Sequence, residues 1–317
     1  MSMIYTVTFN PAVDVMIRVD DLRFGGINRT VSQDIYYGGK GINVSYVLRN
    51  MGRQSTALGF LAGNIGYAMK CALESDGLGS DFVMLPKGET RINTKLRTPN
   101  DEGSLDETAF NASGPVIDDD ALAQLAEKLR ATQDGDVVIL SGGIPSNLPD
   151  TVYAQLLADQ QDKDVLVVVD ATGDLLLNTL EYGPFLIKPN DEELAEIAQC
   201  SPDDRQALIA AARDLHERGA RNVLVSCGGK GAFLIDERGE LSEMDVLKGT
   251  LVNSVGAGDS TVAGFVHGYL QGKEDGFGED DLYRNALQMA MACGAGTAFS
   301  QGLATKDVIE DLLKQVR

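Results

Sequence analysis

The chain has 317 residues, of which 44% are hydrophobic and 23% are charged. This length and composition indicate a folded protein with a large buried core and argue against a disordered chain. The 47 acidic residues outnumber the 27 basic ones and give a formal net charge of −20, which disfavours nucleic acid and anionic membrane surfaces as partners.

Short apolar runs rich in β-branched residues alternate with helical stretches along the chain. The runs cover residues 4–9, 56–61, 137–141, 165–170, 185–188 and 223–226. Continuous apolar runs of this length are typical of strands that are covered on both faces. Between them, apolar residues recur at three- and four-residue spacing, as at Leu122, Leu125 and Leu129. This alternation predicts an α/β fold in which a mostly parallel sheet lies between two layers of helices.

Two segments interrupt this alternation. Residues 14–37 and 89–111 alternate polar and apolar side chains with a period of two and contain turn residues. Such segments are typical of antiparallel hairpins with one exposed face. Because no Pro-rich or Ser-rich linker divides the chain, we expect one domain over residues 1–317, with these two segments forming a small antiparallel β-lid.

The stretch "YGGKGINVSYVLRNMG", residues 37–52, places glycines ahead of a helical pattern. Lys40 lies among these glycines, which leaves its ammonium group available to an anionic ligand. An exposed lysine in a tight turn explains the same residues without a ligand. The P-loop pattern GxxxxGK[ST] occurs nowhere in the sequence, so this stretch is not a Walker A loop.

The stretch "IKPNDEEL", residues 187–194, carries polar side chains where a predicted strand ends. Lys188 ends the strand, and Asn190 and Glu193 lie three residues apart at the start of a helix. Their oxygen atoms could hold water around Mg²⁺ or approach a nucleotide phosphate. A capping box, in which Asn190 caps the helix and Glu193 completes the cap, accounts for both residues without a ligand.

The stretch "VSCGGKGAF", residues 225–233, predicts two strands joined by a glycine turn. The backbone of such a turn could cover an adenine ring or a phosphate, because glycine permits close approach. A simple hairpin explains the stretch equally well.

The stretch "SVGAGDSTVAGF", residues 254–265, predicts the start of a helix. Gly256, Ala257 and Gly258 form its entry, and Asp259 lies in its first turn. The small residues leave the unpaired N–H groups of the helix start uncovered, so an anion can approach closely. Asp259 could instead merely cap the helix or complement its dipole.

The four cysteines, Cys71, Cys200, Cys227 and Cys293, show no CxxC spacing. This favours reduced thiols over a disulfide framework or a zinc site. The first residues lack a signal-peptide pattern, and no apolar run reaches the roughly 20 residues of a membrane helix. We therefore expect a cytoplasmic protein.

In this order, the segments "NPAVD", "GGKGIN", "SGGIPSN", "IKPNDEE", "VSCGGKG" and "NSVGAGDS" resemble the PfkB (ribokinase-like) carbohydrate kinases over nearly the whole chain. The resemblance implies a three-layer α/β/α ribokinase-like core with a β-lid that mediates a homodimer, and ATP and Mg²⁺ as cofactors. The segments "GGKGIN" and "ETRINTK" resemble the branch that acts on phosphosugars, which includes 1-phosphofructokinases and tagatose-6-phosphate kinases.

The resemblance also implies which residues form the site. The catalytic group comprises Asp259 as general base with Gly256, Ala257 and Gly258. Substrate contacts fall on Asp14, Gly38, Gly39, Lys40, Asn43, Arg91 and Ser141, with Arg91 holding the sugar phosphate. Nucleotide contacts fall on Lys188, Asn190, Ser226, Gly228, Gly231 and Ser254. Contacts to Mg²⁺ fall on Asn190 and Glu193, and a potassium site used by some relatives falls near Asn253, Val255, Ser300 and Gly302.

The implied reaction is transfer of phosphate from ATP to a ketose phosphate, with fructose 1-phosphate giving fructose 1,6-bisphosphate. Tagatose 6-phosphate is the alternative substrate, since both molecules offer one phosphate and similar hydroxyl groups. A sensor that binds a sugar phosphate or nucleotide without turnover remains a second hypothesis, against which the intact Asp259 argues. A kinase for an unphosphorylated sugar or nucleoside is a third, against which Lys40 and Arg91 argue.

Overall fold

The structure is a computed structural model that describes residues 2–100 and 104–316. In this part of the chain, a 10-stranded sheet has the order β14-β13-β12-β11-β10-β9-β1-β4-β5, and β6 pairs with β4. Its strands are β1 (Ile4–Thr8), β4 (Thr56–Ala62), β5 (Gly79–Ser80), β6 (Val83–Leu85), β9 (Val137–Ser141), β10 (Leu166–Asp170), β11 (Leu186–Ile187), β12 (Val223–Ser226), β13 (Ala232–Ile235) and β14 (Leu241–Met244).

The sheet is mostly parallel, as the apolar runs predicted. Neighbouring strands from β5 to β12 pair in parallel, whereas β12, β13 and β14 form antiparallel pairs. The turn after β12 is a 3₁₀ helix, η2 (Gly228–Lys230), so the hairpin predicted for residues 225–233 is confirmed. Strand β9 is buried along its whole length because β1 and β10 flank it and helices cover both faces.

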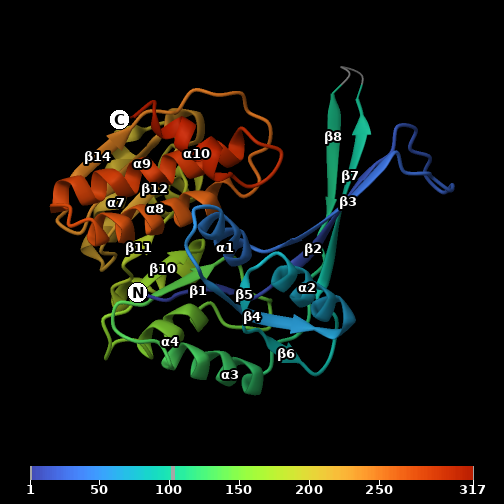
Figure 1. The fold of residues 1–317 in the computed structure, drawn as a ribbon, viewed down its shortest axis with the longest axis horizontal. Helices are drawn as coiled ribbons and strands as arrows, with labels where there is room; N and C mark the ends of the chain where they lie inside the picture. The colour runs from blue at the N-terminus through green and yellow to red at the C-terminus, as the bar shows by residue number, and fades with distance from the viewer. Residues whose placement is uncertain (1, 101–103, 317) are drawn as a thin grey trace.

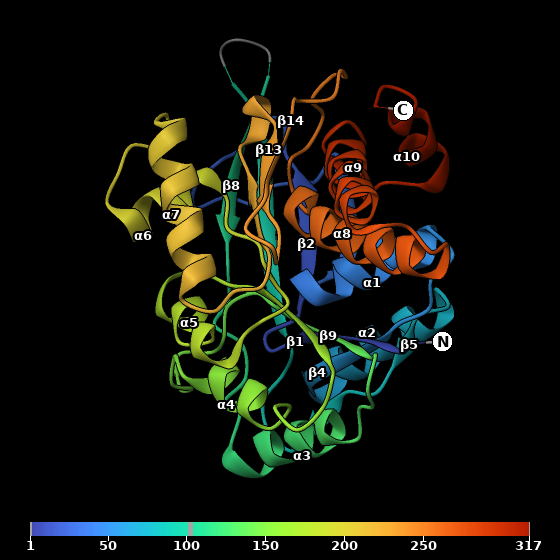
Figure 2. The ribbon, with the colours of Figure 1, turned by 90° about the vertical axis from the view of Figure 1, so that its left-hand side faces the viewer.

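Helices form one layer on each face of this sheet (Figure 2). They are α1 (Lys40–Asn50), α2 (Gly63–Ser75), α3 (Asp119–Arg130), α4 (Val152–Ala158), α5 (Gly173–Leu177), α6 (Asp191–Ala198), α7 (Arg205–Glu217), α8 (Ala257–Glu274), α9 (Glu279–Ala298) and α10 (Lys306–Leu313), with a short 3₁₀ helix η1 (Leu180–Tyr182). One apolar core joins the sheet to α3 to α7, and a second joins its other face to α1 and α8 to α10. This is the three-layer α/β/α arrangement that the sequence predicted.

A second, four-stranded sheet projects from this core (Figure 1). Its strands are β2 (Ala12–Arg18), β3 (Ser32–Gly38), β7 (Arg91–Pro99) and β8 (Leu105–Phe110), in the order β3-β2-β7-β8. We call this sheet the lid; it occupies the segments predicted for it, apart from residues 101–103, which lie outside the described residues, as do residues 1 and 317 of the predicted domain.

The two predicted hairpins of the lid are confirmed, but their junction is parallel. Strands β2 and β3 pair antiparallel, as do β7 and β8, whereas β2 and β7 pair in parallel. The reason is that β2 and β7 both leave the core and run outward, so the two hairpins meet along strands of the same direction (Figure 1). The prediction of an antiparallel lid is therefore wrong for the pair of β2 and β7 and correct for the other two pairs.

The four cysteines are free, as predicted from their spacing. No helix within residues 2–100 and 104–316 has both the length and the apolar character needed to cross a membrane.

Candidate active site

The carboxyl ends of the central parallel strands meet at one edge of the large sheet. Ser141 ends β9 and lies directly beside Asp170, the last residue of β10. Lys188 follows β11, and Asn190 forms an isolated bridge with Ser226 at the end of β12. Ligands of open α/β sheets bind at this edge, so the sheet brings four of the predicted residues to the expected position.

Two helices begin at this edge without a side-chain cap. Gly39 precedes α1 and Gly256 precedes α8. At neither helix start does a capping side chain accept a hydrogen bond from the first N–H groups of the helix. In contrast, Asp118 caps α3 and Asp204 caps α7. The starts of α1 and α8 therefore keep unpaired N–H donors for an anion.

Glycine is required at both of these helix starts. Gly39 has a φ of 141°, and a Cβ atom there would lie 2.6 Å from Cγ2 of Thr8. Gly256 has a φ of 83°, and a Cβ atom there would lie 2.8 Å from Cδ2 of Leu303. A side chain at either position would combine backbone strain with a steric clash, so both helix starts keep their backbone bare.

Asp259 lies in the first turn of α8 and is buried, with 6% of its surface exposed. In the part of the chain that the structure describes, its side chain makes no hydrogen bond to the helix backbone, so it does not cap α8, whereas its place in the first turn still complements the helix dipole. Its Oδ2 atom accepts a hydrogen bond of 2.7 Å from Nδ2 of Asn43. Burial raises the pKa of Asp259 to about 6, the negative charge of Asp170 adds to this rise, and Asn43 and two lysines oppose it.

Those lysines are Lys40 and Lys188, and a single buried carboxylate joins them. Asp170 pairs through Oδ2 with Nζ of Lys40 at 3.1 Å and through Oδ1 with Nζ of Lys188 at 3.3 Å. Burial alone would raise the pKa of Asp170, but the two ammonium groups hold it below its usual range. The glycine-rich surroundings of Lys40 suggested a free cation, but Lys40 is paired with Asp170. Its side chain remains 42% exposed, so a ligand can still reach it.

The first residues of β2 and β7 place Asp14 and Arg91 near each other in the lid. Arg91 is the first residue of β7 and pairs in register with Ala12, so Asp14 lies two residues further along β2, on the same face of the sheet and opposite Asn93. Nδ2 of Asn93 donates a hydrogen bond of 2.8 Å to Oδ1 of Asp14 and so fixes that carboxylate. Burial lowers the pKa of Arg91, against the effect of the nearby Asp14 charge.

Asp14 and Asn43 lie on either side of Gly38. A Cβ atom at Gly38 would lie 3.8 Å from Oδ1 of Asn43 and 3.9 Å from Oδ2 of Asp14. Because Asn43 also binds Asp259, the lid, α1 and α8 contribute to one continuous site. The structure thus brings the predicted sugar-binding and catalytic residues together.

Several buried polar atoms of this region have no hydrogen-bond partner among the described residues. They include Nε of Arg91 and Oγ of Ser141. Buried polar groups in folded proteins are almost always paired, so two unpaired atoms in this region are unusual. Both residues are on the list predicted to bind the sugar phosphate.

Asn190 and Glu193 form the capping box that their spacing allowed. Oδ1 of Asn190 accepts a hydrogen bond of 2.7 Å from N of Glu193, and Oε2 of Glu193 accepts one of 2.9 Å from N of Asn190. The capping-box explanation is therefore correct. Oε1 of Glu193 takes no part in the two hydrogen bonds of this box. Within the described residues no group of three or more His, Cys, Asp or Glu side chains could hold a metal ion.

The remaining predicted nucleotide contacts surround this capping box. Ser226 lies beside Asn190, and Gly228 and Gly231 bound the turn after β12. Ser254 lies in the loop that leads into α8, where its carbonyl oxygen accepts a hydrogen bond of 3.2 Å from N of Ala257. Of these residues, Ser226 lies at the same strand edge as Lys188.

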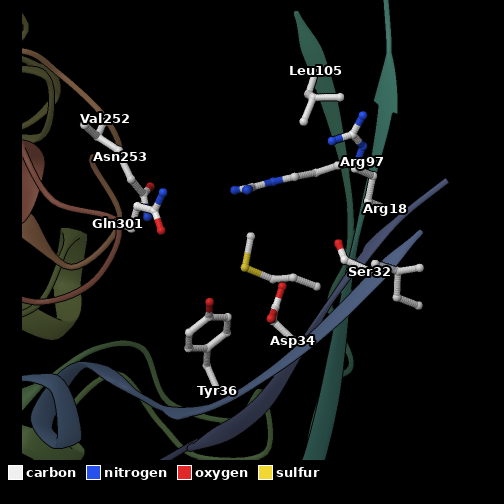
Figure 3. A pocket seen from close by; sticks show the side chains of 11 residues that line it. Arg18, Ser32, Asp34, Tyr36, Arg97, Leu105, Val252, Asn253 and Gln301 are labelled. Carbon is white, nitrogen blue, oxygen red and sulfur yellow. The ribbon is translucent and has the colours of Figure 1, made fainter. Parts of the chain in front are cut away.

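A pocket of about 340 Å³ separates the lid from the loops beside α8. Arg18 and Arg97 line it from the lid, and Asn253 and Gln301 line it from the opposite wall, as Figure 3 shows. Asn253 immediately precedes Ser254, so this pocket adjoins the loop that leads into α8, and Asp259 does not line it. It forms the open outer part of the gap between the lid and the core.

Sequence reasoning missed two residues of the site, Asp170 and Asn93. Asp170 closes a predicted apolar strand, and its position at the strand end was the available signal. Asn93 lies two residues after Arg91 in a period-two segment, so both side chains share a face of the lid. Neither signal identified a partner.

Known proteins are similar to this chain in sequence and in fold. The model of the pfkB family carbohydrate kinases matches residues 7–309. A 1-phosphofructokinase of Bacillus subtilis (strain 168) is 39% identical, with 99% of both chains covered. A D-tagatose-1-phosphate kinase of Bacillus licheniformis is 33% identical, again with 99% of both chains covered. The solved phosphofructokinase-2 of Escherichia coli in complex with fructose-6-phosphate has a TM-score of 0.86 at 23% identity, covering 99% of both chains, and so shares the fold. With its family model matched over almost the full length, the chain belongs to the pfkB family of carbohydrate kinases.

Proposed function

We propose that the protein transfers the γ-phosphoryl group of ATP to a hydroxyl group of a ketose phosphate, with fructose 1-phosphate as the substrate and fructose 1,6-bisphosphate as the product. The observation that carries this proposal is the position of Asp259. Its buried carboxylate, with a pKa of about 6, lies in the first turn of a helix whose N–H groups have no side-chain cap. A base beside an anion-binding backbone is what phosphoryl transfer to a hydroxyl group requires.

In this mechanism Asp259 takes the proton of the accepting hydroxyl group. The hydroxyl oxygen then forms a bond to the γ-phosphorus while the bond to the bridging oxygen of ADP breaks, and ADP leaves. The N–H groups of Gly256 and Gly258 would face the negative charge that develops on the transferring group, and that of Ala257 would join them if its hydrogen bond to the carbonyl oxygen of Ser254 opens. Lys188 supports them, since its Nζ atom lies 3.5 Å from the position that a Cβ atom would take at Gly258.

The sugar phosphate is held by the lid and α1. Asp14, fixed by Asn93, orients hydroxyl groups of the sugar. Gly38 and Gly39, just before α1, contact the ligand through their backbone. Arg91 donates a hydrogen bond of 3.3 Å from Nη1 to the carbonyl oxygen of Ala112, and its guanidinium group would bind the phosphate, since such a group can bind two phosphate oxygens at once. Lys40, whose side chain is 42% exposed, and Ser141 at the end of β9 complete this group of contacts.

Asn190 and Glu193 would hold Mg²⁺ through water, beside nucleotide contacts from Lys188, Ser226, Gly228, Gly231 and Ser254. When bound, Mg²⁺ neutralises charge on the phosphates of ATP. Potassium near Asn253, Val255, Ser300 and Gly302 stays a prediction, as do the single-domain organisation over residues 1–317 and the location in the cytoplasm.

A homodimer through the lid is the second part of the proposal. Val15, Ile35 and Phe110 belong to one row across the four strands, on the face opposite Asp14. Ile35 is 53% exposed and Phe110 is 57% exposed. An apolar row across a sheet is destabilised by contact with water and is covered when two such faces pack together.

The names of similar proteins bear on the choice of substrate. They include kinases of fructose 1-phosphate, of D-tagatose 1-phosphate and of tagatose 6-phosphate, so all three ketose phosphates are candidates. We therefore test ADP release with these three ketose phosphates and with free fructose, and compare kcat/KM. The proposal predicts the highest value for fructose 1-phosphate. No ADP release with any phosphosugar would favour a sensor without turnover.

A further inference from the structure

Asp170 occupies the centre of a charged cluster at the strand edge. It is the last residue of β10 and only 2% exposed. Its carboxylate forms ion pairs with Nζ of Lys40 at 3.1 Å and with Nζ of Lys188 at 3.3 Å. These three residues come from β10, from the start of α1 and from the segment after β11. One carboxylate therefore holds two ammonium groups from separate elements, and the cluster carries a net charge of one positive unit.

The cluster lies next to the reacting centre. Nζ of Lys188 approaches Gly258, which immediately precedes Asp259. The charges of Asp170, Lys40 and Lys188 all act on Asp259, and the amide of Asn43 binds it directly. Asp259 thus faces groups from α1, from β10 and from the segment after β11.

Without Asp170, nothing in the described residues would hold both ammonium groups in place. Lys188 is 4% exposed and pairs with no other carboxylate among the described ion pairs. Lys40 is more exposed, and its side chain could turn toward solvent. Two unpaired ammonium groups at this distance would repel each other, and both would be drawn toward the carboxylate of Asp259. In that position they would block the base from the substrate hydroxyl group.

We propose that Asp170 is a positioning residue for phosphoryl transfer, which holds Lys40 and Lys188 beside the transfer path and keeps both ammonium groups from pairing with Asp259. The proposal rests on the proposed function only for its turnover measurement. Two expectations follow from the charges. Loss of Asp170 lowers the pKa of Asp259, because a negative neighbour is removed and the lysines are released toward it. Loss of Lys40 raises that pKa, because a positive neighbour is removed.

The test is a pH titration of the Asp259 carboxyl group by ¹³C NMR in protein labelled at aspartate, with the resonance assigned by its loss in Asp259→Asn. It is performed on the full chain without substrate, so it does not depend on which sugar phosphate the protein uses. We expect a pKa of about 6 for the wild type. In Asp170→Asn we expect a value lower by about one pH unit, together with a kcat about 10- to 100-fold lower in the ADP-release assay.

Asp236→Asn is the matched control. Asp236 is also 2% exposed and pairs with an arginine, Arg238, at 2.6 Å, but it follows β13 and contacts none of the site residues. We expect Asp236→Asn to lower the thermal midpoint and to leave the titration of Asp259 unchanged. An unchanged titration in Asp170→Asn as well, with only the thermal midpoint lowered, would show that Asp170 is merely structural and would overturn the proposal.

Lys40→Met keeps the test decisive if Asp170→Asn does not fold. This variant leaves Asp170 and Lys188 as a neutral pair, so the buried charges stay balanced. We expect the pKa of Asp259 to rise by about half a unit or more. An unchanged pKa would mean that Asp170 does not hold Lys40 beside the base, and would also overturn the proposal. If both titrations shift as expected while no phosphosugar is turned over, the proposed function fails and the positioning of the lysines stands.

Discussion

Asn43 binds Asp259 through a hydrogen bond of 2.7 Å from Nδ2 to Oδ2, across 216 positions of sequence. This bond joins the first turn of α1 to the first turn of α8, and so connects the sugar-binding helix to the helix that carries the base. The amide holds the carboxylate in one orientation, because the side chain of Asp259 has no cap interaction with its own helix. The relationship leads directly to a prediction for Asn43.

Replacing Asn43 with Ala removes a hydrogen bond to the ionised form of Asp259. Because that bond lowers the pKa of Asp259, its loss raises the pKa, and the acidic limb of the pH profile of kcat/KM moves to higher pH. We also expect kcat to fall about 10-fold, from poorer orientation of the base. Asn50→Ala is the control, since Asn50 lies on the same helix but binds the carbonyl oxygen of Ala304. A limb that moves equally in both variants would contradict this role of Asn43.

The pH dependence of the wild type follows from the same carboxyl group. A general base acts in its ionised form, and the pKa of Asp259 is about 6. We therefore expect kcat/KM to fall tenfold per pH unit below about pH 6 and to be constant above it until another group titrates. The measurement is kcat/KM for the phosphosugar from pH 4.5 to pH 8, at saturating ATP. Constant activity down to about pH 4.5 would exclude a base with this pKa.

Arg91 is expected to act on binding of the phosphosugar rather than on turnover. Arg91→Ala removes charged hydrogen bonds of about 1.5–3 kcal/mol, which corresponds to a KM for the sugar phosphate about 10- to 150-fold higher. Arg91→Lys restores the charge but not the two-point geometry, so it should recover only part of this loss. Arg130→Ala, which removes an exposed ion pair with Asp159 far along the sheet, is the control. An unchanged KM in Arg91→Ala would remove Arg91 from the phosphate site.

The outer face of the lid is expected to mediate self-association. Ile35→Glu places a charge at one end of the exposed apolar row, on the edge strand β3, and should convert a dimer to a monomer in sedimentation experiments. Tyr67→Glu, at a site on α2 that is 64% exposed, is the matched control. A wild type that sediments as a monomer, or an Ile35→Glu dimer of unchanged stability, would exclude this interface.

Local features of the fold could be predicted from the sequence, because they depend on neighbouring residues. The start of α8 at Ala257 and the capping box of Asn190 and Glu193 both follow from spacing over a few residues. The period-two pattern likewise predicted the two hairpins of the lid. Their parallel junction was not predictable, because the pattern identifies a strand without identifying its partner.

The partners of charged residues could not be predicted from the sequence either, because a local pattern does not show which distant residues meet in the fold. Lys40 and Asp170 are 130 positions apart and meet because α1 begins over the carboxyl end of β10. The glycines around Lys40 correctly indicated open space for a ligand but could not reveal a buried carboxylate underneath. The positions of predicted site residues were therefore inferred more completely than the contacts that hold them.

The most direct test of the account is the turnover of Asp259→Asn with fructose 1-phosphate and ATP. Asn keeps the size of the side chain and removes the base, so we expect kcat to fall by about two to four orders of magnitude while the sugar phosphate still binds. The thermal midpoint at pH 7.5 should not fall, because the substitution removes a buried negative charge whose folded pKa is raised. A folded variant with kcat near the wild-type value would contradict Asp259 as the base, and with it the proposed mechanism.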